Sequence, residues 1–292
     1  MINKYDFTLS DPDTFKVFSV KDMLFLYWIC PQVDKHLQLF NHYNEFVFTL
    51  KGKKTFHHNG KSWPLTQDKS LFIRKTAYTT EKHEMVGWEV LAFFFQDEML
   101  RRFFSEYREQ LPVKNLPSPP TDMFVEINMT EIIRGFCYSI VPYFQQKKPP
   151  SENLLELKFN ELLFNVFLEP SNSGLLAYVL RIVDQQSTPI WEVMEANYMF
   201  NLTIAEYARL AGRSVASFKR EFQKYYKTSP GKWLTAKRLE HAKMLISASQ
   251  KSIGEIVYDS GFENVSHFSR IFKENYGETP LQFRKKQQMA LA

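Results

Sequence analysis

The sequence predicts an α+β protein, with a β-rich amino-terminal half and an all-helical carboxy-terminal domain. Three observations support this prediction. Short apolar runs separated by turn signals fill residues 15–95, helical apolar spacing replaces them after Asp97, and a repeated helical pattern occupies the last hundred residues. With 292 residues, of which 44% are hydrophobic and 24% charged, the chain is long enough for about two packed domains.

The amino-terminal half has the pattern of antiparallel strands. Apolar runs at residues 45–50 and 55–58 are followed by Lys51-Gly52 and Asn59-Gly60, and Asn-Gly is the strongest short-range signal for a hairpin. Further apolar runs at residues 71–73 and 90–95 predict buried strands. A small barrel or sandwich over residues 1–110 accounts for these runs.

Helices are expected over residues 111–187, after a helix that begins near Asp97. A proline-rich stretch at 111–120 precedes two helices, at about 130–146 and 152–168, and a shorter one follows from Leu175. The second of these has an apolar stripe, which could pair with a second subunit or pack against the strands of its own chain. The stripe consists of Leu155, Phe159, Leu162 and Val166. We expect it to dimerise the protein, and the polar segment 184–189 to mark a domain boundary.

Positive charge gathers beyond that boundary. Residues 190–292 hold 16 Lys and Arg against 10 Asp and Glu, so this part carries +6 while the rest of the chain carries −1. A basic domain joined to a neutral one is typical of a nucleic-acid reader with an attached control domain. Charge alone does not separate DNA from RNA or from an acidic protein.

The basic part contains a repeat, with an offset of 49 residues before a turn and 50 after it. Thr203 and Ser252 each precede a Glu by three residues, which is the capping box of a helix start. Gly212 and Gly261 stand where that helix must end, because glycine adopts a positive φ without strain. Each copy therefore predicts a helix-turn-helix unit, and residues 230–247 between them predict one connecting helix.

The second helix of each unit has an apolar and a polar side. Two phenylalanines four residues apart anchor the apolar side, Phe218 with Phe222 and Phe268 with Phe272. Surface arginines are most often only solvated, but Arg220 and Arg270 occupy matched positions, and arginine can bind guanine bidentately. We expect ten residues of the two polar sides to contact DNA: Ala216, Ser217, Lys219, Arg220, Gln223, Ser266, His267, Ser269, Arg270 and Lys273.

Residues from about 188 to 287 resemble the carboxy-terminal domain of the AraC/XylS family of transcriptional regulators. The matching segments are residues 238–242, 252–256, 261–262, 266–273 and 277–280. The resemblance implies a sequence-specific regulator, usually an activator, whose domain 188–292 binds two adjacent major-groove segments of double-stranded DNA. It also allows RNA polymerase as a partner.

The layout of the amino-terminal half is similar to that of the subfamily of the exoenzyme S and type III secretion activator. This resemblance implies a cupin-like β-barrel in residues 1–110, a homodimer formed through the helices of residues 111–187, and control by a small-molecule or protein effector.

A cupin metalloenzyme fused to a DNA-binding domain is the alternative function. Residues 42–45 (His-Tyr-Asn-Glu) resemble part of the first cupin motif, but its second histidine is missing, and residues 60–78 supply no matching histidine. His57 and His58 are adjacent and would point to opposite faces of a strand. We therefore expect no metal, no cofactor and no enzymatic activity, with His42 and Glu45 as ordinary strand-edge residues.

The sequence also predicts a cytoplasmic protein. Its two cysteines, Cys30 and Cys137, lie in separate apolar stretches, which suits buried thiols in a reducing compartment. No signal peptide is recognisable at the start, and no apolar run near it approaches the ~20 residues of a membrane span.

Overall fold

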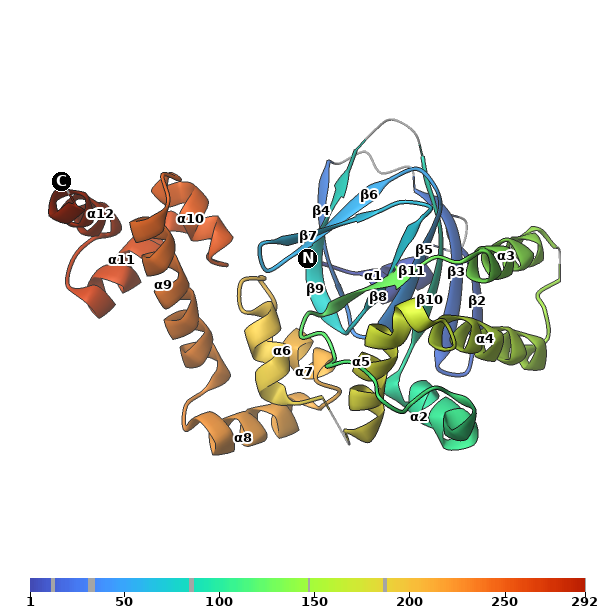
Figure 1. Ribbon diagram of the computed structural model, residues 1–292. Helices are drawn as coiled ribbons and strands as arrows, with labels where there is room; N and C mark the ends of the chain where they lie inside the picture. The colour runs from blue at the N-terminus through green and yellow to red at the C-terminus, as the bar shows by residue number, and fades with distance from the viewer. Residues whose placement is uncertain (12–13, 31–34, 84–86, 147, 186–187, 292) are drawn as a thin grey trace. The chain divides into compact units, whose positions relative to one another are not determined.

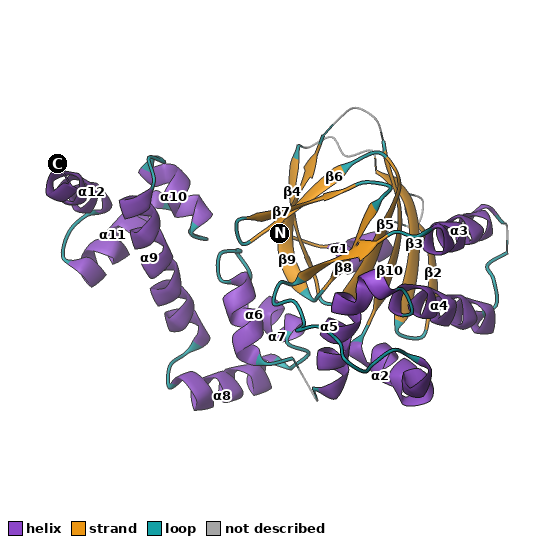
Figure 2. Ribbon diagram, in the orientation of Figure 1, coloured by secondary structure: helices purple, strands orange, loops and turns teal. Residues whose placement is uncertain are grey.

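The computed structural model describes residues 1–11, 14–30, 35–83, 87–146, 148–185 and 188–291. The chain forms two compact units, Met1–Thr188 and Pro189–Ala292. The first contains strands and helices, and the described part of the second is helical (Figures 1 and 2), so the expected α+β class is confirmed. Residues 1–110 and 111–187, expected as separate regions, lie in one unit. Gln186 and Ser187, at the expected boundary, lie outside the described residues.

Strands of the amino-terminal unit form two sheets. Their bounds are β1 (Ile2–Asn3), β2 (Lys16–Val20), β3 (Met23–Cys30), β4 (His36–Asn41), β5 (Asn44–Lys51), β6 (Lys54–His58), β7 (Lys61–Leu65), β8 (Lys69–Ile73), β9 (Thr76–Lys82), β10 (Trp88–Phe95) and β11 (Phe124–Asn128). The five-stranded sheet has the order β1-β4-β9-β6-β7, and the six-stranded sheet has the order β11-β8-β5-β10-β3-β2. Among the described residues each sheet has two edge strands, so the expected cupin-like barrel is not closed.

Most of the expected strands are confirmed. The hairpin at Asn59-Gly60 joins β6 to β7, and both turn residues have positive φ, 48° and 76°. β11 was not expected, because it follows the proline-rich stretch in a region predicted to be helical. It pairs with β8, and Phe124 and Ile127 are buried.

Helices of this unit pack mainly against the six-stranded sheet (Figure 2). They are α1 (Lys4–Ser10), α2 (Asp97–Tyr107), α3 (Glu131–Ile140), α4 (Glu152–Phe167) and α5 (Ser173–Asp184), of which α1 lies against β4. The helix expected over residues 130–146 ends at Ile140, and a 3₁₀ turn containing Pro142 follows, since proline cannot continue the hydrogen-bond ladder.

The apolar stripe of α4 is core packing. Its members Leu155, Phe159, Leu162 and Val166 are all buried, and Leu155 is the most exposed at 3%. The Phe159 ring lies 5.1 Å from that of Phe95 in β10. The sheet of the same chain already covers this stripe, so the expectation that it binds a second subunit is wrong.

The described part of the carboxy-terminal unit consists of helices joined by short turns. Their bounds are α6 (Ile190–Asn197), α7 (Ile204–Leu210), α8 (Val215–Tyr226), α9 (Pro230–Ala248), α10 (Ile253–Asp259), α11 (Val265–Tyr276) and α12 (Pro280–Leu291). The expected connecting helix is α9, capped by Ser229 and begun by Pro230. Its 19 residues span about 28 Å. Its buried residues Leu239, Ala242 and Ile246 share a core with α10, α11 and α12.

Candidate nucleic-acid interface

Both helix-turn-helix units begin at a capping box, as expected. Thr203 Oγ1 accepts a hydrogen bond from the Glu206 backbone N at 3.3 Å, and the Glu206 carboxylate accepts one from the Thr203 N at 2.6 Å. Ser252 and Glu255 make the same pair of bonds at 3.2 and 2.7 Å. Each capping box uses two residues three positions apart, and it defines where α7 or α10 begins.

The turns and second helices also follow the sequence. Gly212 and Gly261 have φ values of 66° and 82°. Ser214 caps α8 by accepting from the Ser217 N at 3.2 Å, and Asn264 caps α11 by accepting from the His267 N at 2.8 Å. The two units therefore share one local construction, despite the additional residue in the second turn.

The anchoring phenylalanines orient α8 and α11. Phe218, Phe222, Phe268 and Phe272 are all fully buried. The opposite faces of the helices are turned to solvent, as their period requires. Eight of the ten expected DNA-contacting residues are exposed, and Ser217 and Ser269 are half-buried; the exposed ones are Ala216, Lys219, Arg220, Gln223, Ser266, His267, Arg270 and Lys273.

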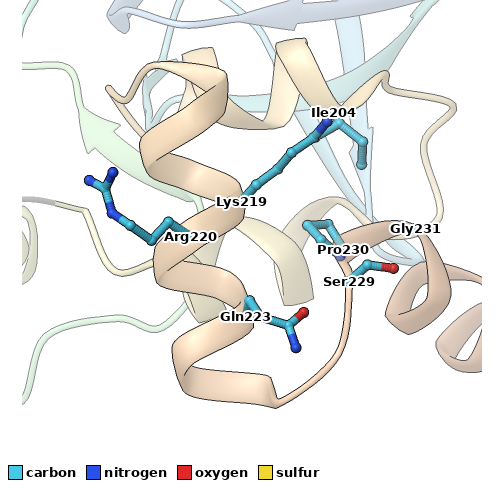
Figure 3. A pocket seen from close by; sticks show the side chains of 7 residues that line it. All are labelled: Ile204, Lys219, Arg220, Gln223, Ser229, Pro230 and Gly231. Carbon is cyan, nitrogen blue, oxygen red and sulfur yellow. The ribbon is translucent and has the colours of Figure 1, made fainter.

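A hollow of about 580 Å³ lies beside α8. In Figure 3, Lys219 extends toward Ile204 at the start of α7, and Gln223 extends toward Ser229 just before α9. Arg220 projects from the other side of α8 in this view. The first helix-turn-helix unit therefore presents two cationic side chains and one amide around an open surface.

Hydrogen bonding differs between the two outward faces. Arg270 Nη1 donates to Glu274 Oε1 at 2.7 Å, one helical turn away. In the first helix-turn-helix unit, Ser217 Oγ donates to Glu221 Oε1 at 2.9 Å and Arg213 Nε donates to Glu221 Oε2 at 2.8 Å. These bonds, that from Ser217 first, hold the pKa of Glu221 below its ordinary value. A partner must therefore compete with Glu221 for Ser217 and with Glu274 for Arg270.

Two cations of α9 have roles inside the domain that the sequence did not reveal. Arg238 donates from Nε to the Tyr198 carbonyl oxygen at 2.6 Å and from Nη2 to that of Phe200 at 2.8 Å. Lys237 Nζ lies 2.8 Å from Glu195 Oε2. The sequence places both cations on the polar side of the helix. Their partners lie about forty residues earlier in the chain, so no local sequence pattern predicts these contacts.

The partial cupin motif has a structural role. Glu45 was expected at a strand edge, but it is fully buried in β5, where it pairs with Lys4 and accepts a hydrogen bond from Tyr78 at 3.4 Å. His42 is half-buried between β4 and β5. Among the described residues, no three His, Cys, Asp or Glu side chains are grouped so that they could hold a metal ion. Within the same residues, no helix is both long and apolar enough to cross a membrane.

Comparison with known proteins agrees with this geometry. The family model of the ExsA N-terminal regulatory domain matches residues 44–178, and that of a helix-turn-helix domain matches residues 207–286. The thermoregulatory protein LcrF of Yersinia pestis is 24% identical over 269 residues, which cover 90% of this chain and 96% of that protein. The virulence regulon transcriptional activator VirF of Yersinia enterocolitica is 23% identical with the same coverage.

The HTH-type transcriptional regulator ExsA of Pseudomonas aeruginosa is 24% identical over 239 residues, covering 81% of this chain and 84% of that protein. The matches span both units and include the duplicated helix-turn-helix construction. The chain is therefore a DNA-binding transcriptional regulator of the AraC/XylS family, in the subfamily of ExsA and VirF.

Proposed function

We propose that α8 and α11 enter two adjacent segments of the DNA major groove and contact it through the ten residues named above. The matched outward faces of the two helices carry this proposal, since both are polar and cationic and both are fixed by the same caps and phenylalanine anchors. The length of α9, about 28 Å, is close to the ~34 Å between successive major grooves.

We also propose that the protein activates transcription, with RNA polymerase as a partner, and that the amino-terminal unit controls it through a small-molecule or protein effector. VirF, a relative over most of the chain, is named a transcriptional activator. The match to a regulatory-domain model over residues 44–178 supports the control role. A regulator without enzymatic activity, acting in the cytoplasm where it meets its DNA, fits these observations.

Arginine substitutions in the full-length protein test the DNA interface. An operator is first selected from random duplex DNA, and Arg220→Ala and Arg270→Ala are then titrated against it. Each variant should bind the operator about 1–3 kcal/mol more weakly if its arginine contacts a base. A phosphate contact would instead weaken binding to operator and random DNA alike and lower the log–log salt slope by ~0.9.

Lys251→Ala is the matched control, because Lys251 is an exposed cation of the carboxy-terminal unit that lies outside the residues of α8 and α11 and already pairs with Asp259. It should bind the operator almost as the wild type does. Equal losses in all three variants would show only a general charge effect, and unchanged binding by both arginine variants would contradict the proposed interface.

We further propose that the protein is a homodimer formed through the outer surface of α3 and α4. These helices pack together, and their exposed apolar residues Ile132 and Leu157 are 68% and 66% accessible. Leu157→Glu should convert a dimer to a folded monomer in analytical ultracentrifugation. A wild-type protein that is monomeric at every accessible concentration would refute the dimer.

A further inference from the structure

A small cavity in the amino-terminal unit is lined by none of the residues proposed to contact DNA. Its volume is about 40 Å³, and it lies among α1 and strands of both sheets. Most of its lining is apolar, with Phe7 from α1, Leu39 and Phe56 from the five-stranded sheet and Trp88 from the six-stranded sheet. Two lysines, Lys4 and Lys54, also line it.

Lys54 is a buried cation beside this cavity. It is only 4% exposed, and its Nζ lies 3.6 Å from Cys30 Sγ and 4.7 Å from the centroid of the Trp88 ring. Within the described part of the chain, no carboxylate lies within 4.0 Å of this ammonium, whereas Lys4 is paired with Glu45. Burial lowers the pKa of Lys54 to about 8. The buried charges around the cavity therefore include one more cation than anions, which is costly in an apolar setting.

Two buried polar side chains at this cavity also have an unsatisfied hydrogen-bonding atom within the described part of the chain. Thr80 is 1% exposed, and neither its buried Oγ1 nor the buried Nε1 of Trp28 has a hydrogen-bond partner among the described residues. Both residues line the same cavity as Lys54. Buried donors are normally satisfied, so three groups that can donate and have no oxygen acceptor at one cavity call for an acceptor from outside the chain.

We propose that this cavity binds a small monocarboxylate, whose oxygens accept hydrogen bonds from Lys54, Thr80 and Trp28 and whose short apolar tail contacts the surrounding rings. A carboxylate matches all three groups, because it offers about four acceptor positions and one negative charge. The volume is that of roughly three water-sized probes, which limits the ligand to a few non-hydrogen atoms while α1 keeps its position.

A series of contacts connects Lys4, at the cavity, with the last residue of the amino-terminal unit. Glu45, which holds Lys4, is followed back along β5 by Asn44, and Asn44 Oδ1 accepts a hydrogen bond from Arg74 Nη1 at 2.6 Å. Arg74 Nη2 in turn donates to Thr188 Oγ1 at 2.7 Å, and Thr188 is the last residue of the unit. An effect of occupancy on transcription rests on the proposed function; the binding site itself does not.

Isothermal titration calorimetry of the full-length protein without DNA tests the site directly. The probes are sodium acetate, butyrate and octanoate, with n-butanol as the uncharged counterpart of butyrate, all at pH 7. We expect saturable binding of butyrate with one site per chain and none of n-butanol. Butyrate affinity should fall as the pH is raised above 8, because Lys54 then loses its proton.

Lys54→Met, which keeps the length of the side chain and removes its charge, should weaken butyrate binding at least tenfold. Thr80→Val, nearly isosteric, should weaken it less and covers the case in which the first variant does not fold. Lys69→Met is the control, because Lys69 is 53% exposed and pairs with Glu126 away from the cavity. Equal binding by wild type, Lys54→Met and Thr80→Val, or no binding of any carboxylate, overturns the proposal.

A second measurement separates the site from the proposed function. Operator affinity is determined with and without saturating butyrate. A protein that binds butyrate but no operator retains the site and loses the proposed function. Binding of butyrate that leaves operator affinity unchanged supports the site and removes its link to DNA.

Discussion

In the amino-terminal unit the guanidinium of Arg74 and the carboxylate of Asp97 meet in the core, at 2% and 9% side-chain exposure, whereas in the carboxy-terminal unit Lys251 and Asp259 meet at the surface. The first pair also holds Lys75 and Asn44. The second pair joins residues eight apart and is open to water. A buried pair is costly to break because its remaining member stays desolvated, while an exposed pair contributes little. The two units should therefore respond differently to loss of one charge.

Replacing Asp97 by Asn should give the largest effect. Arg74 and Lys75 would remain buried without a carboxylate, so we expect a loss of about 3–5 kcal/mol of unfolding free energy in the amino-terminal unit. Asp259→Asn, the matched change at the surface, should cost about 1 kcal/mol or less. Urea unfolding with hydrogen exchange, which reports each unit separately, measures both. Similar values for the two variants would contradict the comparison.

Acid should act through the same carboxylate. Burial by itself raises the pKa of Asp97, but Arg74, Lys75 and a hydrogen bond from Asn44 hold it well below its ordinary range. Because the folded-state pKa is depressed, the stabilisation is complete above about pH 4 and is lost as the pH falls toward the folded value. Acid titration followed by circular dichroism should show this loss in the wild type and a smaller one in Asp97→Asn.

Lys54→Met should have the opposite effect on stability, because it removes a buried charge that has no carboxylate partner within the described part of the chain. We expect the amino-terminal unit to gain on the order of 1–3 kcal/mol at pH 7. The folded-state pKa is lowered to about 8, so the unfolded chain binds more protons between about pH 8 and 10.5. Wild-type stability should rise with pH across that window, and the variant should lack the rise. A variant less stable than wild type at pH 7 would show that contacts of Lys54 with Trp88 dominate.

Helix caps should give the smallest effect, equal in both helix-turn-helix units. Thr203→Ala and Ser252→Ala each remove one capping box, and each should cost the carboxy-terminal unit about 1 kcal/mol. Hydrogen exchange of the two units checks this, and the amino-terminal unit should be unchanged. A difference above about 1 kcal/mol between the two variants would mean that the repeat is not equivalent in its energetics.

The same contrast explains which features the sequence could predict. The carboxy-terminal unit rests on signals a few residues long: a hydroxyl three residues before Glu206, a glycine at position 212, and Phe218 four residues before Phe222. Such patterns can be recognised without the fold. They predicted the outward faces of α8 and α11 correctly, although not the use of Arg238 inside the domain.

The amino-terminal unit depends on partners that are distant in the chain. Glu45 is neutralised by Lys4 from 41 residues away, and Arg74 reaches Thr188 across 114 residues. The stripe of α4 could be identified as apolar, but a stripe does not say which surface covers it. For the same reason β11 could not be expected, since its partner β8 lies beyond a proline-rich stretch.

The close contact between Gly261 and the Met199 backbone affects how the carboxy-terminal unit unfolds. A Cβ at this position would lie 2.8 Å from the Met199 carbonyl oxygen, in the loop between α6 and α7 that Arg238 also holds. Asn201 of the same loop donates to Glu263, just after that turn. The loop before the first helix-turn-helix therefore packs against the turn of the second. Unfolding of one repeat should remove contacts that stabilise the other. Thermal denaturation of this region should proceed as one cooperative transition, with no half-folded species in which a single repeat survives.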